Sequence, residues 1–154
     1  MPNRYGETRI WCLGGGPAGL YFAILMKKAR PRAEITVFER NRPDDTYGWG
    51  VVFSDETLGG LAEADAQSYA AIEASFRRWT DIETFYRGTR TVSTGHGFAA
   101  ISRRRLLLLL QQRCLELGVR LEAEREVSVA DVPADVGLGV ASDGVNSAVP
   151  GAPA

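Results

Sequence analysis

A run of three glycines, placed between a short apolar segment and a stretch without helix breakers, most constrains how this chain can fold. Residues 9–13 are apolar enough for a buried strand, and they end at Gly14-Gly15-Gly16, which is typical of a tight turn. Residues 17–29 predict a helix that starts near Pro17 and ends with cations. Residues 34–39 are β-branched and aromatic, which predicts a second strand. Strand, turn, helix and strand in this order form a right-handed βαβ unit, so we expect an α/β fold with a parallel sheet.

The remainder of the chain predicts further helices, strands and a hairpin. Residues 41–50 are polar and contain turn formers, so we expect a loop there. A helix is expected to start near Ser54–Thr57, and residues 64–79 predict a helix with Phe76 and Trp79 on its apolar stripe. We interpret these two side chains as core residues, the alternative being an aromatic substrate box formed with Trp49. Further expected elements are a hairpin of residues 82–87 and 89–94, a helix over 103–117 closed by Gly118, and strands over 119–123 and 136–141.

Composition and charge exclude several classes of protein. The 154 residues leave room for one domain, and 18 basic against 19 acidic residues argue against a nucleic-acid partner. No apolar run approaches the roughly 18–20 residues of a membrane span, and the polar start of the chain is unlike a signal peptide. The two cysteines have no CxxC partner, so we expect a reduced, cytoplasmic protein. The single histidine excludes a histidine-based metal cluster and argues against a hydrolase triad.

The spacing Gly14-x-Gly16-x-x-Gly19 is that of a dinucleotide-binding fingerprint. Gly14 permits the tight turn, Gly16 lets the backbone approach a pyrophosphate, and Gly19 lets helix and strand pack closely. The amides at the start of the helix then face the phosphates with a partial positive charge. Glu39 ends the next strand twenty positions after Gly19, where a carboxylate can accept hydrogen bonds from the adenosine ribose. The alternative is a structural glycine turn in another kind of α/β protein.

Three motifs together resemble the FAD-binding start of class A flavoprotein monooxygenases, the para-hydroxybenzoate hydroxylase fold. The first is the glycine segment, residues 14–20, followed by Phe38-Glu39-Arg40. The second, Arg103-x-x-Leu106-x-x-x-Leu110, is similar to the family's helix whose leading arginine reaches the FAD pyrophosphate. The third, residues 142–147 (Ser-Asp-Gly-Val-Asn-Ser), resembles its Asp-Gly motif, in which the aspartate contacts the pyrophosphate region and is linked to NAD(P)H use. The resemblance thus implies a Rossmann-like FAD/NAD(P)-binding fold and FAD ligands at Gly14, Gly16, Pro17, Ala18, Gly19, Glu39, Arg40, Arg103 and Asp143.

A second resemblance narrows the family. Residues 41–58 look like a segment of the salicylyl-CoA and 2-aminobenzoyl-CoA 5-hydroxylases, and the violacein-type tryptophan-derived hydroxylases carry a related Gly-Trp-Gly-Val-Val. The segment Gly95-His96-Gly97-Phe98 matches the aryl-CoA group too. The resemblance implies that Gly48 and Gly50 lie near the isoalloxazine. For His96, an exposed loop position is favoured over a catalytic role, and no catalytic side chain is predicted.

Two groups of charged residues have competing interpretations. Arg103, Arg104 and Arg105 stand together at a helix start, where cations oppose the helix dipole. We interpret Arg103 as a pyrophosphate ligand and the other two as solvated, the alternative being three solvated side chains. Asp44 and Asp45 form an adjacent acidic pair in a loop, and we assign them to solvent rather than to a metal.

The resemblance covers about residues 10–149 but only the first part of the family. Residues 1–154 are expected to form a single FAD-binding domain, with the substrate domain absent and a diverged tail at 150–154. This implies a fragment of an NAD(P)H-dependent aromatic hydroxylase of the aryl-CoA type, incomplete for hydroxylation alone. The alternative is a non-catalytic nucleotide- or flavin-binding module that dimerises or pairs with another chain. Leu106–Leu110 is the candidate apolar surface for such a partner, although leucines on more than one face also predict a helix buried on two sides.

Overall fold

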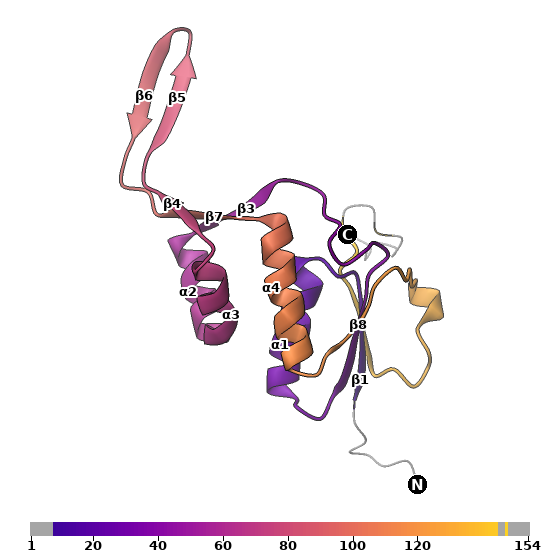
Figure 1. Cartoon of the computed structure of the whole chain (residues 1–154). Helices are drawn as coiled ribbons and strands as arrows, with labels where there is room; N and C mark the ends of the chain where they lie inside the picture. Colours follow the sequence, from indigo (N-terminus) through magenta and orange to yellow (C-terminus); the bar gives the residue numbers. More distant parts are fainter. Residues whose placement is uncertain (1–7, 145–146, 148–154) are drawn as a thin grey trace, which may run out of the picture. The chain divides into compact units, whose positions relative to one another are not determined.

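The computed structural model describes residues 8–144 and residue 147, and it divides the chain into two compact units (Figure 1). Unit 1 takes the residues up to Asp45 and those from Leu107 onward, and unit 2 takes Thr46–Leu106. Helix α4 (Arg103–Glu116) begins in unit 2 and ends in unit 1. No helix among the described residues is long and apolar enough to cross a membrane.

Unit 1 is built on a four-stranded parallel sheet. Its strands are β1 (Arg9–Leu13), β2 (Glu34–Phe38), β8 (Arg120–Glu122) and β9 (Leu138–Ala141), in the order β8-β2-β1-β9. Helix α1 (Pro17–Ala29) connects β1 to β2, whose register runs from Arg9 opposite Glu34 to Leu13 opposite Phe38. A short 3-10 helix, η1 (Val129–Asp131), precedes β9. The predicted α/β fold with a parallel sheet is confirmed.

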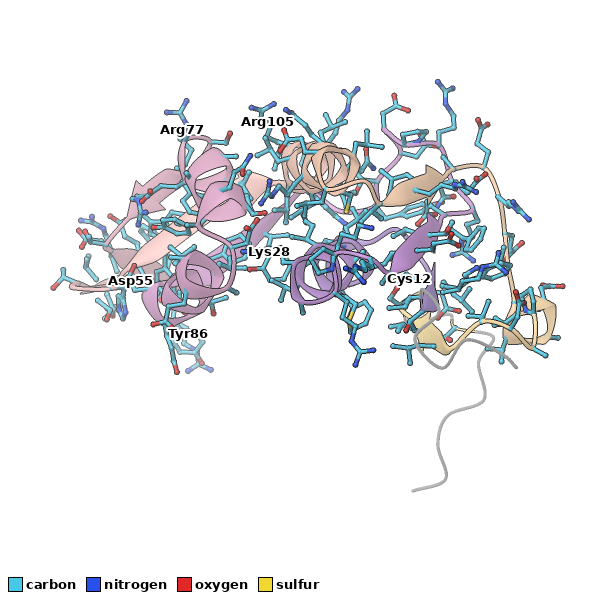
Figure 2. All side chains as sticks on the ribbon, turned by 90° about the horizontal axis from the view of Figure 1, so that it is seen from below. Cys12, Lys28, Asp55, Arg77, Tyr86 and Arg105 are labelled. Atoms are coloured by element: carbon cyan, nitrogen blue, oxygen red, sulfur yellow. The ribbon has the colours of Figure 1, made fainter. Side chains whose placement is uncertain are left out.

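The core of unit 1 lies where α1 and α4 meet the sheet. Burial alternates along β1, where Ile10 and Cys12 are almost fully buried. Figure 2 labels Cys12 on this strand. From α4, the buried Cys114 places its Sγ 3.5 Å from the carbonyl oxygen of Leu20 on α1. Both cysteines are free, and burial raises the pKa of each thiol to about 12. These thiols therefore serve as small apolar core groups.

Unit 2 holds an antiparallel sheet, two helices and a hairpin. The sheet has the order β3-β7-β4, from β3 (Gly50–Ser54), β7 (Phe98–Ser102) and β4 (Arg77–Trp79). Helices α2 (Asp55–Ala64) and α3 (Ala66–Glu73) follow β3, and β5 (Ile82–Tyr86) and β6 (Thr89–Ser93) pair only with each other (Figure 1). The buried apolar side chains of this unit are Leu58, Ile72, Ala99, Ile101 and Leu106.

The predicted helix over 64–79 is wrong in its second half. Asp65 ends α2 and caps α3, which ends at Glu73. Residues 77–79 instead pair with β7, because an antiparallel neighbour satisfies their backbone groups. Phe76 is half-buried against Phe53, with ring centroids 5.7 Å apart. Trp79, which was expected in the core, is 37% exposed.

The leucine run of α4 is buried rather than free for a partner. Leu106, Leu107 and Leu110 are all buried, which agrees with a helix covered on more than one side. The expectation that Leu106–Leu110 forms an exposed apolar surface is therefore wrong for most of the run. Large exposed apolar side chains lie instead in unit 2, on the loop before β3 and on the β5–β6 hairpin, and include Tyr47, Trp49, Phe85 and Tyr86.

Candidate dinucleotide-binding site

The loop between β1 and α1 needs glycine where it contacts the chain after β9. Gly14 has a φ of +114°, and a side chain there would bring its Cβ within 2.7 Å of the backbone nitrogen of Asp143. A Cβ on Gly19 would lie 2.5 Å from Ser142 Oγ and would collide with the carbonyl oxygen of Gly14. Gly14 thus makes the tight turn and Gly19 the close packing that the fingerprint predicts.

Gly16 differs from these two glycines, because a Cβ there would meet no atom within 4 Å. It is the N-cap of α1, in extended conformation, and no side chain caps the helix. Pro17 occupies the start of the first turn, which contains no acidic residue. Among the described residues, no side chain caps the amides at this helix end, and the space beside Gly16 is open. Such an end fits the negative charge of a pyrophosphate.

The Glu39 carboxylate is held beside the same loop. Its Oε2 accepts a hydrogen bond from the backbone nitrogen of Gly15 at 2.8 Å. Its Oε1 accepts from the backbone nitrogen and from Nδ2 of Asn41, both at 2.9 Å. The half-buried carboxylate is thereby fixed at the carboxyl end of β2, next to the open end of α1. A carboxylate has about four lone-pair sites, so it retains capacity for ribose hydroxyls.

The chain after β9 closes the other side of the loop. Ser142 donates from Oγ to the carbonyl oxygen of Gly14 at 2.9 Å, and its backbone nitrogen donates to Leu13 at 2.7 Å. Asp143 is half-buried and follows directly, and Gly144 has a φ of +87°. The fingerprint, Glu39 and Asp143 are therefore gathered at the carboxyl edge of the parallel sheet, where ligands of such sheets bind. Val145, Asn146, Pro150 and the expected diverged tail lie outside the described residues.

Three other predicted site residues meet in unit 2. Gly48 has a φ of +86°, and a Cβ there would lie 3.9 Å from Cδ of Arg103. The backbone nitrogen of Arg103 donates to the carbonyl oxygen of Trp49 at 3.2 Å. A Cβ on Gly50 would lie 2.9 Å from the carbonyl oxygen of Ile101, so β3 and β7 can approach closely there. Gly48, Gly50 and Arg103 thus form one local cluster.

The three adjacent arginines have different surroundings. Arg105 donates from Nε to Ser75 Oγ at 3.2 Å, and Arg104 also has an interaction. Among the residues that the structure describes, the half-buried Arg103 guanidinium has no hydrogen-bond or ion-pair partner. A guanidinium is a strong bidentate ligand of phosphate. Of the three, Arg103 is the one available to an anion.

Other predicted positions carry ordinary surface interactions. Arg40 is exposed and lies 3.9 Å from the Glu126 carboxylate, with the two facing solvent. Asp44 lies 3.7 Å from Arg42. Within the described part of the chain, no three histidine, cysteine or acidic side chains gather as a metal site would require.

Sequence reasoning missed three side chains that shape these sites. Asn41 and Ser142 hold Glu39 and the glycine loop; they open the segments 41–58 and 142–147, but the sequence predicts no role for either side chain. His96, expected as an exposed loop residue, is half-buried, with its Nε2 2.7 Å from Ser93 Oγ. The Gly95–Phe98 motif was the available signal for it.

Comparison with known proteins adds a family and relatives. The sequence model of the family described as lycopene cyclase protein matches residues 10–150. The chain is 48% identical over 139 residues to a salicyloyl-CoA 5-hydroxylase from Streptomyces sp., with 90% of this chain and 27% of that protein covered. Over the same share of this chain it is 32% identical to a 3-hydroxy-4-methyl-anthranilyl-[aryl-carrier protein] 5-monooxygenase from Streptosporangium sibiricum, of which 39% is covered. A protodeoxyviolaceinate monooxygenase from Chromobacterium violaceum is also 32% identical over 90% of this chain, with 38% of it covered.

These findings confirm the resemblance to aryl-CoA and violacein-type hydroxylases. The tetrameric form of 2-methyl-3-hydroxypyridine-5-carboxylic acid oxygenase matches with a TM-score of 0.68 at 22% identity, over 78% of this chain and 32% of that one, which shows the fold. The chain spans between about a quarter and two fifths of the length of its curated relatives.

Proposed function

The chain belongs to the lycopene cyclase protein family, and from its relatives and its glycine loop we propose that it is the FAD-binding part of an NAD(P)H-dependent aromatic hydroxylase. The observation that carries the proposal is the uncapped start of α1 at Gly16, open to solvent, with the Glu39 carboxylate fixed beside it. This pairing suits a dinucleotide: a pyrophosphate for the helix end and a ribose for the carboxylate.

Each predicted residue has a proposed part in holding the cofactor. The amides following Gly16 hold the pyrophosphate, and Arg103 neutralises it. Glu39 accepts hydrogen bonds from the adenosine ribose, and Asp143 borders the pyrophosphate. Gly48 and Gly50 leave room for the flavin ring. Bound flavin would take a hydride from NAD(P)H and activate O2, while the protein positions the ring and excludes water.

Under the same proposal, this sequence holds only part of what hydroxylation requires. The relatives that carry the named activities are two and a half to four times longer than the matched segment. We propose that both units belong to one FAD-binding domain, and that a second copy or a complementary chain covers its exposed apolar surface. The aryl-CoA substrate class and a reduced, cytoplasmic setting are part of this proposal.

Titration with FAD tests the proposal directly. The purified chain is titrated with FAD, its absorbance near 450 nm is followed, and gel filtration shows whether flavin co-elutes. We expect Gly16→Val to abolish binding of both FAD and ADP, because a side chain would fill the space that the pyrophosphate needs.

Gly59→Val is the matched control, because a Cβ on Gly59 also meets no atom within 4 Å, and Gly59 lies on α2 in unit 2 rather than in the glycine loop of unit 1. Unchanged affinity of Gly16→Val for FAD and ADP would contradict the proposal that this loop binds a dinucleotide. ADP binding without FAD binding would instead favour the non-catalytic nucleotide module.

A further inference from the structure

Three rings stack on one face of the antiparallel sheet in unit 2. Phe98 lies in the middle: the Trp79 ring centroid is 5.7 Å away with the planes at 30°, and the His96 ring centroid is 5.5 Å away with the planes at 24°. Trp79 is the direct partner of Phe98 in the pairing of β4 with β7. His96 precedes β7 by two residues, so its side chain follows the same side as Phe98.

The face that carries these rings is the one turned away from the core of unit 2. Alternation along β7 buries Ala99 and Ile101, and it leaves Phe98 on the opposite face. Val52, opposite Ala100 in the register with β3, is 57% exposed. Within the described residues of unit 2, this face carries Phe98 and Val52 together with the exposed Arg77, which pairs with Ala100.

His96 is fixed more firmly than an exposed loop residue would be. Its backbone nitrogen donates to the carbonyl oxygen of Thr80 at 2.8 Å, and its Nε2 shares a hydrogen bond of 2.7 Å with Ser93 Oγ. Its ring also stacks on Phe98. Among the described residues, Nδ1 is the ring nitrogen left without a partner. When the serine hydroxyl donates to Nε2, the neutral ring presents Nδ1–H to a ligand, and when Nε2–H donates to the serine oxygen, it presents a bare Nδ1.

The backbone next to His96 is also tightly determined. A Cβ on Gly97 would meet the carboxylate of the exposed Asp55 at the start of α2, so a side chain there would displace Asp55. In Figure 2, Asp55 and Arg77 are labelled in this unit. The ring stack is held by strand pairing at Trp79 and by the backbone hydrogen bond from His96 to Thr80.

We propose that the stack of Trp79, Phe98 and His96 binds the aromatic ring of the substrate, and that Nδ1 of His96 hydrogen-bonds to a hydroxyl or amino group on that ring. The proposal rests on the proposed function, which supplies the aromatic substrate. Planar rings stack favourably on aromatic faces. The names of two relatives specify rings of this kind, a salicyloyl group with its hydroxyl and an anthranilyl group with its amine. His96 is then a substrate-positioning residue, which distinguishes substituted rings from bare ones.

The single histidine of the sequence makes a direct test possible. In the untagged chain, the imidazole C–H proton resonances belong to His96 alone. We expect salicyloyl-CoA to shift these resonances, with and without FAD, and CoA alone to leave them in place. No shift at saturating salicyloyl-CoA would overturn the proposal.

Variants separate the hydrogen bond from the stacking. His96→Phe keeps a ring in the stack but removes Nδ1, and we expect it to weaken salicyloyl-CoA binding about tenfold, as loss of one hydrogen bond to a buried partner does. His96→Asn returns an acceptor close to Nδ1 and should recover part of the loss. Benzoyl-CoA, which lacks the hydroxyl, should bind the wild-type chain and His96→Phe equally. Equal loss for both thioesters would show a purely structural role and contradict the proposal.

FAD affinity of the same samples keeps the two proposals distinguishable. The stack lies in unit 2, and the glycine loop lies in unit 1. If FAD binds normally and the His96 resonances do not shift with salicyloyl-CoA, only the proposal that the stack binds the substrate ring is contradicted. Absent FAD binding in the wild-type chain would contradict the proposed function itself.

Discussion

At the scale of single residues, burial sets the chemistry of the two cysteines. Cys12 and Cys114 are fully buried, and desolvation raises the pKa of both thiols from 9.0 to about 12. Only the thiolate is a strong nucleophile. We therefore expect both to react slowly with 5,5′-dithiobis(2-nitrobenzoic acid) at pH 8 in the native chain, and rapidly in urea.

An exposed cysteine on the same helix as Cys114 provides the control. Gln112→Cys should add one thiol that reacts at once without urea, since Gln112 is exposed. The raised pKa also has a consequence for stability: burial of the neutral thiols contributes fully below pH 9, and this contribution is lost as the pH rises from about 9 to 12. Rapid labelling of either native cysteine at pH 8 would contradict this description of the core.

The residues of the glycine loop could be predicted from the sequence, but their supports could not. Gly14 and Gly19 stand at spacings dictated by the turn and by helix packing, and Glu39 stands at the end of the next strand. Ser142 reaches the loop only because β9 pairs with β1, a contact between residues more than a hundred positions apart. Local patterns carry no information about such a contact.

At the scale of secondary structure elements, Asp65 explains why the helix predicted over 64–79 divides. It is 2% exposed, and its carboxylate accepts from the backbone nitrogen of Ser68 at 3.1 Å and from Ser68 Oγ at 2.5 Å. This is an N-cap, and it starts α3 directly after α2. We expect Asp65→Ala to lower the free energy of unfolding in urea by about 1–2 kcal/mol.

Asp45→Ala is the matched control, because Asp45 is exposed and caps no helix. It should change the unfolding free energy by no more than a few tenths of a kcal/mol. Equal effects of the two substitutions would show that the Asp65 cap does not stabilise α3.

The elements that the sequence predicted well have strong local signals, and those it missed depend on pairing. The helix over 103–117 has a continuous run of good helix formers and ends at Gly118, whose φ is +80°. Strands β3 (Gly-Val-Val-Phe-Ser) and β7 (Phe-Ala-Ala-Ile-Ser) are mostly apolar but only five residues long, and neither shows a clear alternation of apolar and polar residues. They form because each pairs with the other, and short strands of this kind have weak intrinsic preference.

At the scale of the whole molecule, the β5–β6 hairpin is the apolar surface that needs a partner. Phe85 is 70% exposed and Tyr86 is 66% exposed, and every residue of both strands is exposed. An isolated two-stranded hairpin is only marginally stable in water, and exposed aromatic side chains favour association. The hairpin, and not the mostly buried leucine run of α4, is therefore the exposed apolar surface where we expect a partner to bind.

We therefore expect the chain to self-associate through the hairpin when no complementary chain is present. Multi-angle light scattering after gel filtration should give a mass above the 16.8 kDa of one chain. Phe85→Ser combined with Tyr86→Ser should restore the single-chain mass, because the substitutions remove the apolar surface without touching a buried contact. Leu115→Ser, an exposed leucine on α4, serves as the control and should leave the assembly unchanged. A single-chain mass for the wild-type protein at all concentrations would instead mean that the exposed hairpin does not bind a second copy.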